Sequence, residues 1–145
     1  MKNNTEITSQ DKLREAGIRV TGPRIRIYEY LLTHRTHPTC DDIYRSLKDK
    51  DKSLSLASVY NVTEKLSEVG LVAEIISPDG QKHYDGIIDF HGHFFCKSCG
   101  KIMDVSCSHD FLPEHLEGCK VDSVSLVISG ECKDCVTGKD LDQNL

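Results

Sequence analysis

Apolar residues recur at helical spacing through the first half of the chain, and capping residues divide them into four predicted helices. The first is short, over residues 11–16, with Ser9 as its expected N-cap. The second opens near Pro23 and turns Ile25, Tyr28 and Leu32 towards a core. A third helix follows the break at His37-Pro38, with Thr39 and Asp42 resembling a capping box.

The fourth helix has the clearest pattern, and it runs from about residue 56 to 69 before Gly70. Its apolar residues, Val59, Val62, Leu66 and Val69, all lie on one face. The opposite face is polar and carries Ser58, Tyr60, Asn61 and Lys65. Two extended runs around Pro78-Asp79-Gly80 then predict a β-hairpin.

Short helices followed by a hairpin are the layout of a winged helix-turn-helix, in which the last helix enters a major groove and the hairpin forms the wing. Tyr60 and Asn61 are candidates to contact base edges. The candidates to contact phosphates are Arg19, Arg24 and Arg26. A small helical domain with a solvated polar face is the other interpretation. The candidate DNA-binding residues are Arg19, Arg24, Ser58, Tyr60, Asn61 and Lys65.

Composition adds two facts: the 145 residues include seven cysteines, and the formal net charge is −5. With no apolar run long enough for a membrane span and no signal-peptide pattern at the start, a cytoplasmic protein is expected. Cytosolic thiols stay reduced, so this many cysteines indicates metal binding rather than disulfides. The charge is unequally divided: residues 1–83 hold 13 Lys and Arg against 12 Asp and Glu, whereas residues 84–145 hold 5 against 11. The acidic total therefore does not exclude DNA as a partner of the first part.

Four of the cysteines form two CxxC pairs, Cys96/Cys99 and Cys132/Cys135. Each such turn brings two thiolates to one ion, and two turns complete a closed tetrahedral shell typical of structural Zn²⁺. The alternative is a reversible redox dithiol, which needs a CxxC at the start of a helix. Strand-like runs next to both pairs favour zinc, and the run before the second pair is the alternating Val124, Leu126 and Ile128. A short helix is expected over residues 109–116, and the segment 137–145 is expected to be a loose polar tail.

A second cluster of ligand-type side chains lies just before the first cysteine pair. His91 and His93 project to the same side of an extended segment, and Asp85 and Asp89 lie upstream. A hairpin around the first CxxC brings Asp104 near His93. Imidazoles and carboxylates without a thiolate suit Fe²⁺ or Mn²⁺, and also Zn²⁺ or Ni²⁺. Cys40, Cys107 and Cys119 are expected to be bystanders.

Together these motifs resemble the ferric uptake regulator (Fur) superfamily of bacterial metalloregulators. The resemblance rests on LREAGIRVTGPRIRIYEYL, HPTCDDIY, SLASVYNVTEKLSEVGLV, DFHGHFFCKSCGKIMDV and GECKDC, in the family's order. It implies an α+β fold with an N-terminal winged helix-turn-helix and a C-terminal α/β dimerisation domain that carries the Cys₄ zinc site. The corresponding division is a DNA-binding domain over residues 1–84, a hinge over 85–91 and a metal-binding dimerisation domain over 92–145.

The resemblance also implies a regulatory metal site that includes His37, a residue that composition does not single out. Its ligands would be His37, Asp85, His91, His93 and Asp104. A metal held by this set would fix the winged helices of a homodimer at one spacing, which suits two half-sites of a double-stranded operator. Loss of the metal would release the hinge.

Asp104 and the His91-Gly92-His93 spelling are similar to the peroxide-sensing (PerR) branch, because many iron-sensing relatives have Glu at that place. That branch implies a repressor, not an enzyme, in which Fe²⁺ reduces H₂O₂ and the oxidant attacks His37 or His91. Mn²⁺ would fill the same site without that chemistry. The alternatives are an iron, manganese or zinc uptake regulator of the same family, a thiol redox enzyme, and a zinc-stapled interaction module without a DNA role.

Overall fold

The computed structural model describes residues 7–107 and 114–142 of the chain. It divides into two compact units, 1–88 and 89–145. The division falls inside the segment 85–91 for which a hinge is predicted, and the role of that segment as a hinge stays a prediction. No helix in the described ranges is both long and apolar enough to cross a membrane.

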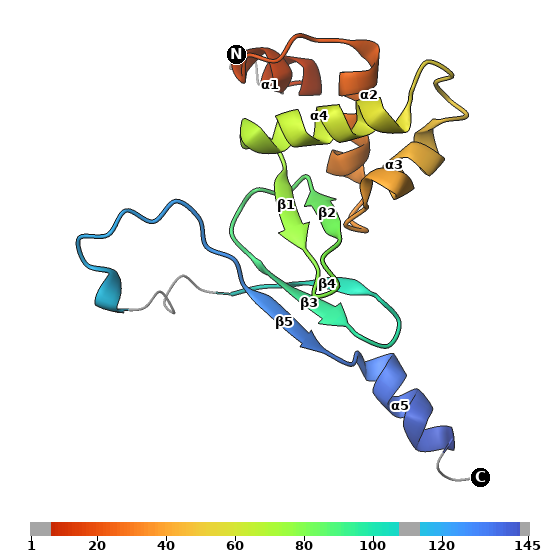
Figure 1. Cartoon of the computed structure of the whole chain (residues 1–145), viewed down its shortest axis with the longest axis vertical. Coiled ribbons are helices and arrows are strands. Elements are labelled where there is room, and N and C mark those ends of the chain that lie inside the picture. Colours follow the sequence, from red (N-terminus) through yellow and green to blue (C-terminus); the bar gives the residue numbers. More distant parts are fainter. Residues whose placement is uncertain (1–6, 108–113, 143–145) are drawn as a thin grey trace, which may run out of the picture. The chain divides into compact units, whose positions relative to one another are not determined.

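The first unit consists of four helices followed by a two-stranded antiparallel hairpin (Figure 1). The helices are α1 (Ser9–Glu15), α2 (Gly22–Thr33), α3 (Cys40–Leu47) and α4 (Leu56–Glu68), and the strands are β1 (Ala73–Ile76) and β2 (Lys82–Asp85). The hairpin pairs Ala73 with Asp85 at its open end and Ile76 with Lys82 near the turn. The predicted order of helices and hairpin is therefore confirmed.

One hydrophobic core holds the four helices together. Its most deeply buried side chains come from all four of them: Leu13, Ile27, Leu31, Ile43, Val59 and Leu66. The predicted face of α2 is partly wrong, because Ile27, Tyr28 and Leu31 are buried while Ile25 and Leu32 only pack against the edge of the core. Helix α2 contacts α1, α3 and α4, so its buried side is set by three partners rather than by its own periodicity.

Each helix of the first unit begins after a Ser or Thr whose side chain accepts a hydrogen bond from a backbone N–H of the first turn. The caps are Thr8, Thr21, Thr39 and Ser55. The predicted cap Ser9 is therefore wrong, because Ser9 is the first residue of α1 and Thr8 caps the helix. A reciprocal bond from the third helical residue completes a capping box in α1, α3 and α4.

The second unit is built on a three-stranded sheet in the order β4-β3-β5. Its elements are β3 (Gly92–Cys96), β4 (Ile102–Val105), a 3₁₀ turn (Glu114–Leu116), β5 (Val127–Gly130) and α5 (Lys133–Asp142). Strand β3 pairs antiparallel with β4 and parallel with β5. The predicted helix over 109–116 lies largely outside the described residues.

Two expectations for the second unit are wrong. The last strand was expected to include Val124, but it begins only at Val127, where pairing with His93 of β3 starts. Residues 137–142 of the expected loose tail instead belong to α5, which extends to Asp142, and the last three residues of that prediction lie outside the described part of the chain. Pairing across the sheet therefore decides the limits of β5, because an alternating pattern alone does not show where a partner strand begins.

Candidate metal centres and DNA-contacting face

The four cysteines of the CxxC pairs converge on one point. Cys96 ends β3 and Cys99 lies in the turn before β4, while Cys132 precedes α5 and Cys135 lies in its first turn. Sγ of Cys96 is 3.7 Å from Sγ of Cys135, and Sγ of Cys99 is 3.8 Å from Sγ of Cys132. Zn–S bonds of about 2.3 Å in a tetrahedron place sulfur atoms about 3.8 Å apart. The four thiols thus match the dimensions of a zinc shell.

The backbone around the cluster favours thiolate at one position. The N–H of Cys132 donates to Sγ of Cys96 at 3.3 Å, and backbone hydrogen bonds from Cys132 and Cys99 lower the pKa of Cys96 to about 6. Hydrogen bonding with Cys132 and Cys96 raises the pKa of Cys135 to about 12. A cation is needed before all four cysteines lose their protons, and a divalent metal supplies that charge.

The expected contrast with a redox dithiol fails for the second pair, which does open a helix: Cys132 directly precedes α5. The joint geometry of the two pairs nevertheless favours zinc. Sulfur atoms of different pairs approach within 3.8 Å, and no cysteine forms a disulfide. Of the remaining thiols, Cys40 is buried against Thr63, while Cys107 is half-buried and Cys119 is exposed. Among the described residues, no metal-type cluster contains any of these three.

In the second unit, two imidazoles share one carboxylate oxygen. Oδ1 of Asp104 is 3.2 Å from Nε2 of His91 and 3.5 Å from Nε2 of His93. Asp104 stands directly opposite His93 in the β3–β4 ladder, as the hairpin around the CxxC predicts. Nδ1 of His91 donates to the carbonyl oxygen of Asp89 at 2.7 Å, which leaves Nε2 of His91 as the nitrogen with a lone pair. The arrangement suits a divalent cation.

In the first unit, His37 and Asp85 form a buried pair. Nε2 of His37 is 3.4 Å from Oδ2 of Asp85, and both side chains are almost fully buried. His37 has φ of 52°, and it is the one residue other than glycine with a positive φ in the described part of the chain. Such strain in a non-glycine residue persists only where the surroundings hold it in place.

Neighbouring groups hold this pair in place, and the sequence did not single them out. Nδ1 of His83 donates to the carbonyl oxygen of His37 at 2.8 Å, and the N–H of Tyr84 donates to that of Pro38 at 3.0 Å. These bonds tie β2 to the turn after α2. A Cβ at Gly86 would lie 2.6 Å from the carbonyl oxygen of Leu31, so only glycine lets the chain pass there. In the sequence, His83 and Asp85 lie two residues apart in an extended run and so share one face, and this spacing is the pattern that could have identified His83 as a neighbour of the pair.

Helix α4 presents the predicted polar face. Tyr60, Asn61 and Lys65 are exposed, and Val59, Val62 and Leu66 are buried. Thr63 is also fully buried, where its hydroxyl donates to the carbonyl oxygen of Val59. Ser58 differs from the other candidates because its hydroxyl accepts from the N–H of Ser55 and donates to the carbonyl oxygen of Ser55. The hydroxyl of Ser58 therefore serves the capping box.

The candidate arginines are held in different ways. Arg19 is exposed, and Arg24 donates to the carbonyl oxygen of Arg19 at 2.9 Å. The guanidinium of Arg26 instead forms an ion pair with Asp51, which compensates a buried carboxylate. Arg26 is therefore engaged within the fold, whereas Arg19 and Arg24 together place two positive charges at the start of α2.

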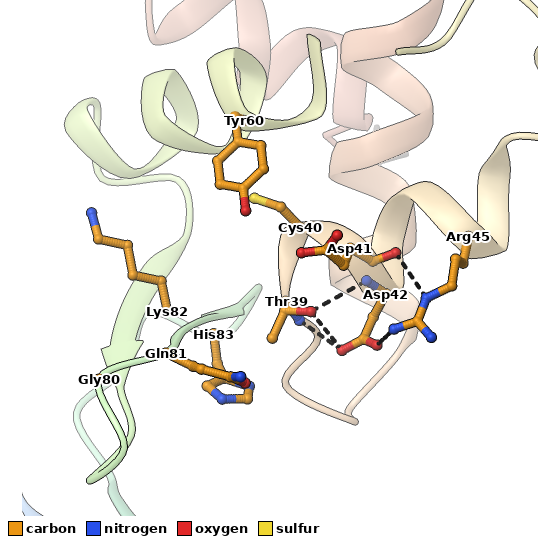
Figure 2. Close-up of a pocket in the computed structure, with 10 residues that line it drawn as sticks. All are labelled: Thr39, Cys40, Asp41, Asp42, Arg45, Tyr60, Gly80, Gln81, Lys82 and His83. Atoms are coloured by element: carbon orange, nitrogen blue, oxygen red, sulfur yellow. Dashed lines mark hydrogen bonds and ion pairs between the residues drawn. The ribbon is translucent and has the colours of Figure 1, made fainter. Parts of the chain in front are cut away.

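A pocket of about 600 Å³ lies between the start of α3, the exposed face of α4 and the turn of the hairpin (Figure 2). The ring of Tyr60 points from α4 towards Cys40 and Asp41, and the negative charge of Asp41 raises the pKa of Tyr60. The guanidinium of Arg45 binds Asp42 at 2.9 Å. Tyr60 thus keeps its phenolic proton and remains a hydrogen-bond donor at neutral pH.

Comparisons with a family model and with known proteins agree on one family. The model of the ferric uptake regulator family matches residues 15–128. The peroxide operon regulator of Bacillus subtilis is 38% identical over 129 residues, covering 86% of this chain and 89% of that protein. The peroxide-responsive repressor PerR of Staphylococcus aureus strain Mu50 is 35% identical over 127 residues, covering 85% and 86%.

Solved structures show the same fold. The ferric uptake regulator of Vibrio cholerae has a TM-score of 0.67 at 24% identity, covering 86% of this chain and all of that one. The ferric uptake regulator of Pseudomonas aeruginosa, solved with manganese, has a TM-score of 0.65 at 25% identity, covering 86% and 97%. The predicted α+β architecture is confirmed.

Proposed function

The chain belongs to the ferric uptake regulator family, and on this premise we propose that it is a metal-dependent transcriptional repressor that senses hydrogen peroxide. The observation that carries the proposal is the thiol-free triad of His91, His93 and Asp104, in which both imidazoles approach one carboxylate oxygen. Relatives that are 34–38% identical over most of the chain are named for their response to peroxide, which supports the same role here.

Two metals have different tasks in this proposal. Zn²⁺ is structural and is bound by Cys96, Cys99, Cys132 and Cys135, whose spacing suits a closed tetrahedral shell. Fe²⁺ or Mn²⁺ is regulatory and uses nitrogen and oxygen donors, which suit those ions better than thiolates do. The zinc shell leaves no position open for substrate, so reaction with peroxide belongs to the second metal.

The regulatory ion is proposed to take five ligands, His37, Asp85, His91, His93 and Asp104. Support comes from each half taken alone: the buried His37–Asp85 pair and the triad of His91, His93 and Asp104 each offer nitrogen and oxygen donors that suit a cation. Only residues 86–90 separate Asp85 from His91, so one ion can bind both sets. Binding of the ion would then link the winged helix to the second unit.

DNA is proposed to bind to the exposed face of α4 through Tyr60, Asn61 and Lys65, with Arg19 and Arg24 on phosphates. Ser58 supports this face through the capping box. The second unit is proposed to form the homodimer, so that two winged helices meet two half-sites of an operator. Metal binding favours the spacing that fits the operator, and loss of metal removes that preference.

Fe²⁺ held by the proposed ligands would activate H₂O₂. In the net reaction the imidazole of one ligand would be oxidised by H₂O₂, gaining one oxygen atom, while the other oxygen would leave as water. His37 and His91 are the proposed targets. The hydrogen bond from Nδ1 of His91 to the carbonyl oxygen of Asp89 orients the His91 ring, and the bond from His83 to the carbonyl oxygen of His37 holds the backbone of His37. Oxidation happens once per molecule, so the protein acts as a regulator and not as a turnover enzyme.

Mass spectrometry tests this chemistry directly. The zinc-loaded protein is supplied with Fe²⁺ or with Mn²⁺, treated with H₂O₂ and digested. We expect a gain of about 16 Da, one oxygen atom, on peptides with His37 or His91, and only with Fe²⁺. Oxidation confined to cysteine, or histidine oxidation that is equal with Mn²⁺, would instead favour a metal-uptake regulator of the same family.

Binding to operator DNA is tested through its dependence on salt. A repressor that neutralises phosphates releases counterions, so its affinity should fall steeply as the salt concentration rises. We expect Lys65→Gln to reduce this slope by about one per protomer, and so by about two for the bound dimer, because each protomer loses one phosphate contact. Lys97→Gln, an exposed lysine of the second unit, is the matched control and should leave the slope unchanged. An unchanged slope in Lys65→Gln would remove Lys65 from the interface.

A further inference from the structure

A fixed positive charge lies beside one proposed metal ligand. The guanidinium of Arg35 is 3.8 Å from Oδ1 of Asp85, on the side chain whose other oxygen is 3.4 Å from Nε2 of His37. The Asp85 side chain is 3% exposed, whereas that of Arg35 is 38% exposed. A half-exposed arginine thus reaches the rim of a buried carboxylate.

We propose that Arg35 is a built-in competitor of the regulatory metal that weakens binding of the divalent cation by acting on Asp85. The inference rests on the proposed function, because it takes Asp85 as a ligand of that metal. Arg35 acts through Asp85: its charge pairs with the carboxylate in the absence of metal, and it does not bind the metal itself. The effect sets a threshold of metal concentration below which the site stays empty.

Electrostatics gives the direction of the effect. A guanidinium keeps its charge at all physiological pH values, so it neutralises part of the Asp85 charge whenever no metal is present. When a divalent ion binds Asp85, the same guanidinium repels it from nearby. The N–H of Ile87 already donates to Oδ1 of Asp85 at 2.9 Å, so the carboxylate keeps its orientation when Arg35 is replaced. Removal of the charge should therefore tighten metal binding without disordering the ligand.

The size of the effect is limited by exposure. Solvent reaches the guanidinium and screens it, so the interaction is that of a pair near the surface and weakens with salt. For charges at this separation we expect about a threefold to tenfold change in the dissociation constant of the metal. A merely structural role of Arg35 would instead lower stability and would loosen metal binding.

The test measures Mn²⁺ affinity of the zinc-loaded full chain by the loss of the electron paramagnetic resonance signal of free Mn²⁺. Arg35→Gln should bind Mn²⁺ about threefold to tenfold more tightly, and the gain should shrink as salt is raised. Arg35→Lys keeps the charge and should remain near the wild-type affinity. Arg14→Gln removes the same charge from an exposed pair with Asp11 and should change the affinity less than about twofold.

Two outcomes overturn the inference, and one variant separates it from the proposed function. Unchanged or weaker Mn²⁺ binding in Arg35→Gln contradicts a competitor role. An equal gain in Arg35→Lys does so too, because the charge would then be irrelevant. Asp85→Asn should lose Mn²⁺ binding. If it binds like the wild type, the proposed ligand set itself is wrong; if it loses binding while Arg35→Gln is unaffected, only the role of Arg35 is wrong.

Discussion

At the scale of single residues, the triad of His91, His93 and Asp104 depends on the length of the Asp104 side chain. Oδ1 of Asp104 lies within 3.5 Å of both imidazoles because Asp104 stands opposite His93 in the ladder. A glutamate is one methylene longer, so its oxygens would pass beyond the point between the rings. The residue type at position 104 is therefore tied to the geometry around His91, where oxidation is proposed.

Asp104→Glu should lower the yield of oxidised His91 severalfold when Fe²⁺ and H₂O₂ are added, because the ring and the metal lose their mutual alignment. Quantitative mass spectrometry of the His91 peptide measures the yield. Asp89→Glu is the matched control, because Asp89 contacts His91 through its backbone carbonyl rather than its carboxylate. Equal yields in the wild type and Asp104→Glu would leave the link between Asp104 and peroxide sensing without support.

At the scale of elements, α4 depends on the capping box that starts it. The side chain of Ser55 accepts from the N–H of Ser58, and the hydroxyl of Ser58 accepts from the N–H of Ser55 in return. These bonds satisfy backbone donors that the first helical turn leaves open. The exposed face with Tyr60 and Asn61 follows within two turns, so the cap also orders the surface proposed to contact DNA.

Ser55→Ala should lower the free energy of unfolding by about 1 kcal/mol, because the first turn of α4 loses its cap. Chemical denaturation monitored by circular dichroism measures the change. Ser67→Ala, in the same helix near its other end, is the control and should be neutral or slightly stabilising, because alanine favours helix more than serine does. Equal changes in the free energy of unfolding for the two substitutions would show that the Ser55 cap does not stabilise α4.

Elements also show where sequence patterns lose their power. The prediction for helix α4 is close because only one face of this helix packs against the core. That face carries a single apolar stripe, with Val59, Val62 and Leu66 buried. Helix α2 has a wider buried region, so Ile25 and Leu32 were placed too deep. Helix α5 is polar in its described part and was missed, because no apolar face marks it in the sequence.

At the scale of the molecule, the two units have different sources of stability. Every residue of the main hydrophobic core lies in the first unit, from Leu13 to Tyr84. In the described part of the second unit, Val127 and Ile128 of β5 are exposed, and Cys96 and Cys132 are among its few buried apolar side chains. The second unit therefore has little hydrophobic core of its own, and the zinc proposed at its cysteines is expected to supply its stability, as in small metal-stapled folds.

Removal of zinc should unfold the second unit and leave the first unit folded. Hydrogen exchange of the full chain after chelation, or of Cys132→Ser, is expected to show lost protection in β3, β4 and β5 and retained protection in α2 and α4. Cys119→Ser, which alters an exposed cysteine outside the cluster, is the matched control. Loss of protection in both units at once would show that they fold as one cooperative body.

By itself the sequence determined the order of helices and hairpin, the four zinc cysteines and the family, because these features depend on local spacing and on residue types that few other folds combine. Only the tertiary structure decided which face of α2 is buried, where β5 begins, that Arg26 serves Asp51, and that Arg35 lies beside Asp85. The physical reason is the distance along the chain over which each kind of interaction acts. Periodicity and capping act over a few neighbouring residues, whereas burial, strand pairing and ion pairs depend on partners fifty or so positions away, such as Asp85 for Arg35.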